Sequence, residues 1–163
     1  MPVNYDLLII FKIAQYAVLS IAVILFVYSN WIAKLLYRKK FIGGKYEGRS
    51  EVHVDYISKL KSEKETIREP YTEKFEIKQN LFKVNISGKS LTLDGKTLIS
   101  TWNGTLFKQK QDTYYFAIEL DGSKGIYGIL KIAYDENEIH GIYYSSNPEA
   151  KSPFTLNASK NYK

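Results

Sequence analysis

The segment LLYRKKFIGGKYEGRSEV, residues 35–52, contains the boundary between two kinds of sequence. An apolar run stops at three consecutive bases, Arg38, Lys39 and Lys40. Two glycines follow, and from Gly44 onward apolar and polar side chains alternate with a period of two. Alternation of this kind indicates a half-buried strand, whereas a long apolar run is typical of a membrane helix. The sequence therefore predicts an anchor in residues 1–40 and a strand-rich domain in residues 41–163.

The apolar run before the boundary is long enough to cross a bilayer. Residues 13–28, IAQYAVLSIAVILFVY, carry no charge, and Gln15 is their one strongly polar side chain. About 20 such residues at 1.5 Å each cross a hydrocarbon core of roughly 30 Å. A cleaved signal peptide is the alternative, but no basic region precedes the run and no small-x-small cleavage site follows it. We expect one retained helix that continues to Leu36.

The charges indicate how such a helix is oriented. Residues 1–40 hold five bases against one acid, whereas residues 41–163 hold 18 bases against 16 acids. Because the three consecutive bases follow the apolar run directly, the positive-inside rule places the C-terminal domain in the cytoplasm of a single-pass protein. The lipid bilayer is then the first expected partner. The net charge of +6 lies mostly at the anchor, so it does not predict DNA binding.

The domain beyond residue 40 consists of short alternating segments separated by polar turns. The predicted strands are 44–56, 71–79, 81–88, 90–95, 97–107, 113–120, 125–134, 138–146 and 154–160, with a charged connection at 59–69. Turn signals such as Asp94-Gly95 join neighbouring strands into hairpins. Eight or nine sequential strands favour an all-β fold, a small up-and-down antiparallel β-barrel of about eight strands. A β-sandwich is the competing architecture.

Several inward positions of these strands are polar or aromatic rather than aliphatic. They are Tyr46, Ser50, Ser100, Trp102, Tyr114, Tyr143 and Ser145. Each one alone is explained by a satisfied polar group in a core. Together they indicate a cavity for a flat, hydrogen-bonding ligand, because a barrel of this size can enclose one small molecule.

Other chemistries have little support in the sequence. The chain has no Cys and only two His, His53 and His140, so we expect no metal site. It has no glycine-rich phosphate loop between a strand and a helix and no G-x-S-x-G motif. The acids fall almost entirely on outward positions or in turns. We therefore expect neither an enzyme nor a cofactor.

The order of these features resembles a known family, the membrane-anchored β-barrel effectors of CBASS antiphage systems. The resemblance rests on the basic stop after the anchor, the strand GKYEG with Gly44, Tyr46 and Gly48, and the late strand with Gly141 and Tyr143. It implies a barrel that binds a cyclic oligonucleotide second messenger made by a CD-NTase, which acts as a functional partner without a stable complex. It also implies homo-oligomerisation on activation, disruption of the bacterial inner membrane and cell death.

The number of membrane helices and the placement of the bases differ from what this family would lead us to expect. The family commonly has two membrane helices, whereas this sequence has room for one clear crossing. The bases that could meet phosphates are Arg49 and Arg68, both at outward or loop positions. Two other hypotheses stay open. One is a membrane-tethered structural or assembly barrel without a small ligand, and the other is a lipid-binding barrel at the bilayer surface.

Overall fold

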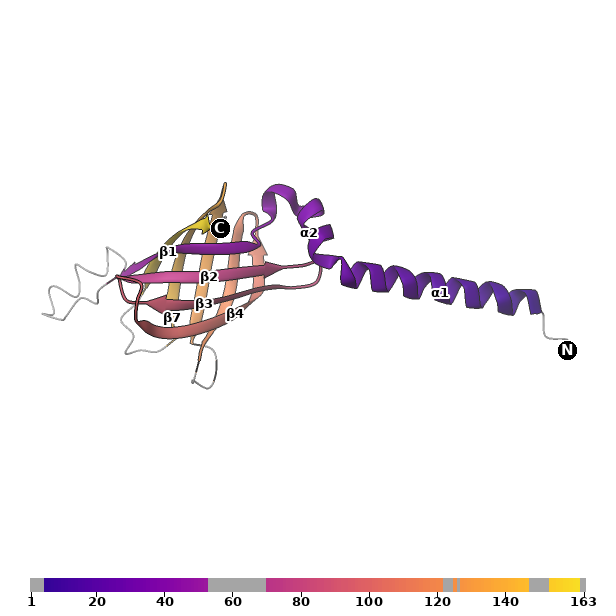
Figure 1. Ribbon diagram of the computed structural model, residues 1–163, viewed down its shortest axis with the longest axis horizontal. Helices are drawn as coiled ribbons and strands as arrows, with labels where there is room; N and C mark the ends of the chain where they lie inside the picture. The colour runs from indigo at the N-terminus through magenta and orange to yellow at the C-terminus, as the bar shows by residue number, and fades with distance from the viewer. Residues whose placement is uncertain (1–4, 53–69, 122–124, 126, 147–152, 162–163) are drawn as a thin grey trace, which may run out of the picture.

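The computed structural model describes residues 5–52, 70–121, 125, 127–146 and 153–161. The predicted connection 59–69, with Arg68, and the end of the first predicted strand, 53–56, lie outside these residues. The described chain is an N-terminal helical segment followed by a β-barrel (Figure 1). The all-β prediction is confirmed for the described residues beyond the helices.

The helical segment has three parts, α1 (Tyr5–Val27), α2 (Ser29–Tyr37) and the short 3-10 helix η1 (Arg38–Lys40). In α1, Ile9–Val27 is long and apolar enough to cross a membrane, and none of it is buried against the rest of the protein. The single helix predicted to reach Leu36 is interrupted at Tyr28, where φ is −98° and ψ is 11°. Ser29 and Ala33 of α2 are buried. Helix α2 runs in a different direction from α1, and the bend is visible in Figure 1.

The barrel has eight antiparallel strands in sequence order. They are β1 (Gly44–Val52), β2 (Tyr71–Gln79), β3 (Val84–Leu91), β4 (Leu98–Lys110), β5 (Thr113–Leu120), β6 (Gly128–Asp135), β7 (Glu138–Ser145) and β8 (Phe154–Asn161). Each strand pairs with the next, and β1 pairs with β8 from Lys45↔Asn161 to Val52↔Phe154, which closes the barrel. The up-and-down barrel is therefore confirmed, and the sandwich alternative is wrong.

One pair of predicted strands is a single strand. The segments predicted at 81–88 and 90–95 both contribute to β3, because Gly88 and Lys89 continue the ladder with β2 and β4. Residues 81–83 and 92–95 lie outside β3, in the turns before and after it. Packing explains why residue 88 is a glycine. A Cβ at this position would lie 2.6 Å from both Phe75 and Trp102, so glycine lets these two rings approach each other across the strand.

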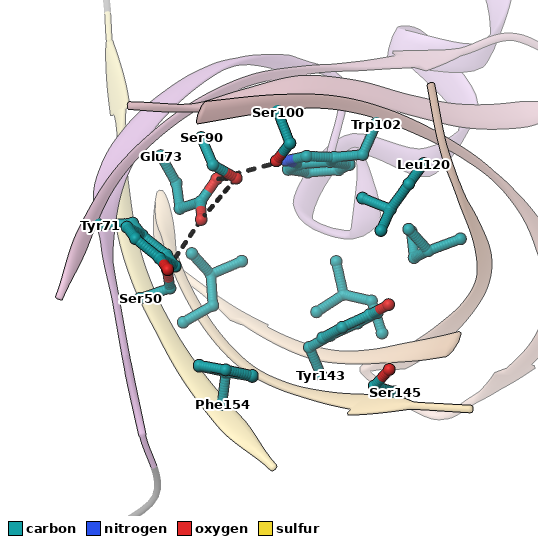
Figure 2. Close-up of a pocket in the computed structure, with 13 residues that line it drawn as sticks. Ser50, Tyr71, Glu73, Ser90, Ser100, Trp102, Leu120, Tyr143, Ser145 and Phe154 are labelled. Carbon is teal, nitrogen blue, oxygen red and sulfur yellow. Dashed lines mark hydrogen bonds between the residues drawn. The ribbon is translucent and has the colours of Figure 1, made fainter. Parts of the chain in front are cut away.

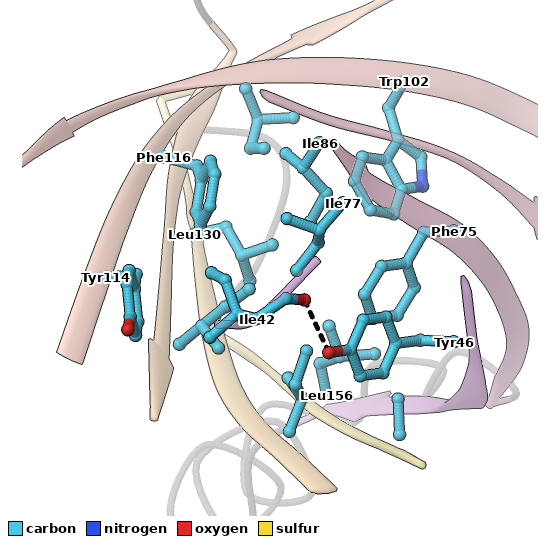
Figure 3. Packing of buried hydrophobic residues seen from close by; sticks show 14 residues of the cluster. Ile42, Tyr46, Phe75, Ile77, Ile86, Trp102, Tyr114, Phe116, Leu130 and Leu156 are labelled. Carbon is cyan, nitrogen blue, oxygen red and sulfur yellow. Dashed lines mark hydrogen bonds between the residues drawn. The ribbon is translucent and has the colours of Figure 1, made fainter. Parts of the chain in front are cut away.

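The two ends of the barrel differ. At the anchor end, where β1 begins, large side chains fill the interior, among them Ile42, Tyr46, Phe75, Tyr114 and Phe116 (Figure 3). At the far end, where β1 stops, the interior is hollow. A small barrel normally fills its interior with side chains or encloses one small ligand, so the hollow end is the candidate ligand site.

The linker between η1 and β1 closes the anchor end. Ile42 is fully buried, its backbone N–H donates to Gln79 Oε1 (2.9 Å), and its carbonyl accepts from the Tyr46 hydroxyl (2.6 Å). The Tyr114 hydroxyl donates to the Lys40 carbonyl (3.0 Å). Burial, together with the nearby Asp112 and Tyr134, raises the pKa of Tyr114 to about 12, so this hydroxyl stays a donor at any physiological pH. Three interior side chains thus hold the chain that leads to the anchor.

Candidate functional site

The far end of the barrel contains a cavity of about 200 Å³. Six of the eight strands contribute to its polar and aromatic lining, which consists of Ser50, Tyr71, Glu73, Ser90, Ser100, Trp102, Tyr143, Ser145 and Phe154. The apolar remainder is Ile118, Leu120, Leu130 and Leu156. A small apolar cavity with a few convergent polar groups has the composition expected of a ligand site.

A buried carboxyl group, that of Glu73, is the centre of the polar wall (Figure 2). Glu73 lies on β2 with its side chain directed into the barrel, and the residue is only 6% exposed. The Ser50 hydroxyl donates to its Oε1 (2.7 Å), and the Ser90 hydroxyl lies 2.9 Å from Oε2 and 3.0 Å from Oε1. The Trp102 indole Nε1–H donates to Oε2 (3.3 Å). Donors from β1, β3 and β4 therefore converge on one carboxyl group.

The position of Glu73 decides its protonation behaviour. Burial raises the pKa of this carboxyl group above its ordinary value, and the hydrogen bonds from Ser50, Ser90 and Trp102 oppose that rise. A buried acid that is not paired with a base is costly to the fold. None of the cavity-lining residues is a Lys or Arg. The wall around Glu73 is therefore acceptor-rich and acidic, and it suits a ligand that presents N–H groups or a positive charge.

The opposite wall is aromatic and less polar. Figure 2 places Tyr143, Ser145 and Phe154 across the hollow from Glu73. The Tyr143 hydroxyl donates to the Tyr127 carbonyl (3.1 Å), and burial raises the pKa of Tyr143, so the phenol stays neutral. Aromatic faces on this wall and on Trp102 offer a stacking surface to a planar group.

The structure brings together five of the eight residues predicted to bind a ligand. Ser50, Ser100, Trp102, Tyr143 and Ser145 line the cavity. The other three do not. Tyr46 and Tyr114 are buried in the packed anchor end, where their hydroxyls bind backbone carbonyls. Arg49 is exposed on the outer face, in a shallow groove beside Glu47, Thr72 and Lys74.

Sequence reasoning missed Glu73 and Ser90. The signal for Glu73 was present, because it lies two residues after Tyr71 and two before Phe75, both of them inward residues of the same strand. The alternation therefore places Glu73 on the inward face, where an acid is unusual and indicates a candidate site. Ser90 was missed because one predicted strand ended at Gly88 and the next began at Ser90, so the inward face of β3 was not followed across this boundary.

The bases predicted to flank the membrane lie at the other end of the barrel from the cavity. Arg38 and Lys40, at the two ends of η1, are exposed at the anchor end, and Lys40 Nζ lies 3.9 Å from the exposed Asp112. Among the described residues, no group of three or more His, Cys, Asp or Glu side chains is arranged to hold a metal ion.

The sequence matches no family model, and no curated protein is significantly similar to it.

At pH values above the folded-state pKa of Glu73, Glu73→Gln should stabilise the ligand-free protein, because it removes a buried charge and keeps an acceptor for Ser50 and Ser90, a gain reduced by the loss of the acceptor of the Trp102 N–H. The pKa of Glu73 is raised in the folded state, so its favourable contribution is fully present below the unfolded pKa. That contribution is lost as the pH rises through the folded pKa. The melting temperature of the wild type should therefore fall across that window relative to the variant. Glu76→Gln, on the outer face of the same strand, is the control and should follow the wild type. Identical pH profiles for Glu73→Gln and wild type would contradict this account.

Proposed function

We propose that this protein is a membrane-anchored receptor whose barrel binds a cyclic oligonucleotide second messenger in the far-end cavity, and that it acts as a CBASS antiphage effector. The observation that carries the proposal is the buried carboxyl group of Glu73 in a cavity that also presents aromatic faces. Guanine, adenine and cytosine present amino or ring N–H groups on a flat aromatic ring. An acceptor-rich wall opposite aromatic side chains is complementary to such a base.

The size and charge of the cavity indicate how an oligonucleotide would lie. About 200 Å³ suits one base rather than a whole cyclic dinucleotide. Because the cavity lining contains no basic side chain, the phosphates would stay at the mouth, in water, while a base enters. Arg49 does not serve this role on the present geometry, since it is exposed on the outer face.

The same features weigh against the two other hypotheses. A lipid-binding barrel would need a uniformly aliphatic interior, and Glu73 with its two serines is an unfavourable neighbour for an acyl chain. A tethered structural barrel without a ligand would be expected to fill its far end with side chains, as the anchor end is filled. An unpaired buried acid is a cost that a purely structural core would avoid.

The proposed output is self-association of α1 in the bacterial inner membrane, with the barrel in the cytoplasm. A single helix cannot form a pore, so membrane disruption requires several protomers. Small side chains at Ala14, Ala17 and Ser20 permit close helix packing. A ligand that binds the associated state more tightly would shift the population toward it by its differential affinity.

A thermal-shift panel of cyclic di- and trinucleotides on the full chain in detergent micelles tests ligand binding. A ligand at about 100 times its Kd stabilises the folded state by roughly 2.7 kcal/mol, which is a shift of several degrees. We expect a selective shift that Glu73→Gln removes and that Glu76→Gln leaves in place. No shift with any cyclic nucleotide, on protein shown to unfold cooperatively, would favour the tethered structural barrel instead.

A further inference from the structure

Helix α2 exposes most of its large apolar side chains and buries two small ones. Ser29 and Ala33, one turn apart, form its buried face, while Trp31 and Leu35 lie on the opposite face and are 65% and 53% exposed. A surface helix of a soluble domain has the reverse arrangement. Trp and Leu on the outward face, with Lys34 and Arg38 nearby, are typical of a helix that lies in the headgroup region of a bilayer.

The tip of the β2–β3 hairpin carries a further exposed apolar residue, Phe82. Asn80 Oδ1 accepts hydrogen bonds from the backbone N–H groups of Phe82 (2.9 Å) and Lys83 (2.8 Å), and the Asn80 N–H donates to the Lys83 carbonyl (3.0 Å). This turn holds Phe82 outward, 68% exposed. In Figure 1 the hairpin points toward the end of the barrel from which α1 leaves. If α1 crosses a bilayer, Phe82 is therefore on the side of the barrel that faces the lipid.

The charges at the anchor end distinguish its two sides. Exposed bases, Arg38, Lys40, Lys83 and Lys110, belong to η1 and the β2–β3 and β4–β5 hairpins, and Asp112 offsets one of them. The β6–β7 hairpin instead carries exposed acids, Asp135, Glu136 and Glu138. Strand order places the β6–β7 hairpin across the barrel from the β2–β3 hairpin. Anionic lipid would attract the first side and repel the second.

We propose that α2 and the β2–β3 hairpin tip form a docking surface for the headgroup region of an anionic bilayer, the same bilayer that α1 crosses. The surface consists of Trp31, Leu35, Phe82 and the surrounding bases. It continues directly from the membrane span, because α1 ends at Val27 and α2 begins at Ser29. The bases are attracted to an anionic surface, and the apolar side chains add burial in the interface. The contact fixes the barrel in a tilt, with the acidic β6–β7 hairpin away from the membrane.

The absence of cysteine from the chain allows a direct test by site-directed spin labelling. Single-cysteine variants Leu35→Cys and Phe82→Cys, in the full chain, carry nitroxides in vesicles of phosphatidylethanolamine and phosphatidylglycerol. Asp135→Cys, on the opposite side of the anchor end, is the matched control, and Ile21→Cys reports whether α1 is inserted. Power saturation with oxygen, which partitions into lipid, and with a nickel chelate, which stays in water, measures the accessibility of each label.

We expect the ratio of oxygen to nickel accessibility to be several-fold higher at positions 35 and 82 than at 135. In phosphatidylcholine vesicles the ratio at 82 should fall, because the bases lose their partner. A label at 82 as accessible to nickel as the label at 135, with position 21 in lipid, would overturn the proposal. Shielding of 35 and 82 from both reagents would also overturn it, since that result means that a protein, such as a second copy, covers the surface.

Discussion

Replacing Tyr46 with alanine should lower the free energy of unfolding of the barrel by about 3–5 kcal/mol, the usual range for truncating a buried aromatic residue. Tyr46 is 2% exposed, its ring is stacked on that of Phe75 with centroids 5.2 Å apart, and its hydroxyl binds the Ile42 carbonyl. The truncation would leave a cavity at the anchor end and an unsatisfied carbonyl. Urea unfolding followed by circular dichroism measures the loss.

Two further variants separate the contributions of the ring and the hydroxyl. Tyr46→Phe keeps the stacking and should cost about 1–3 kcal/mol, the penalty for leaving one buried acceptor unpaired. Tyr144→Ala, on the outer face of β7, should change stability by no more than about 0.5 kcal/mol. A loss for Tyr46→Ala no larger than that for Tyr144→Ala would show that the packed anchor end does not support the fold.

Deleting the membrane span should abolish cell killing and leave ligand binding intact, if the barrel is the receptor and α1 its output. The variant replaces Ile9–Val27 with a hydrophilic linker of equal length. The barrel closes on itself through β1 and β8, so its cavity does not depend on α1. Viability of cells that also make the activating nucleotide measures killing, and the thermal shift measures binding.

A polyleucine helix of the same length is the matched variant for the span. It keeps the anchor but removes the small residues Ala14, Ala17 and Ser20, so it separates tethering from helix–helix contact. Killing that survives in the hydrophilic variant would locate the killing activity in the barrel and contradict the proposed mechanism. Killing that survives only with polyleucine would mean that tethering suffices.

The barrel could be predicted from the sequence because its strands alternate with a period of two and are separated by short turns. Where a strand crosses a glycine, as β3 does at Gly88, alternation weakens, and one strand was predicted as two. The break in the apolar helix at Tyr28 could not be predicted, since no proline or glycine marks it. Ser29 and Ala33, directly after the break, are buried, and composition does not reveal that burial.

The candidate site could be predicted only in part, for a different physical reason. Alternation gives the face of each strand, so it identified Ser50, Trp102 and Tyr143 as inward. It does not give depth along the barrel axis, which decides whether an inward residue packs in the filled end, as Tyr46 does, or faces the cavity. Depth depends on the register between strands, and that becomes known only from the pairing.

Closure of the barrel also limits how protomers can assemble. Because β1 pairs with β8 as well as with β2, every described strand has a hydrogen-bonded neighbour on both sides, and the described barrel leaves no row of backbone donors and acceptors at an edge. Crowded protomers therefore cannot join their barrels into a continuous sheet or grow a cross-β fibre without first opening. Contacts between the barrels of neighbouring protomers would therefore be made by side chains rather than by backbone pairing.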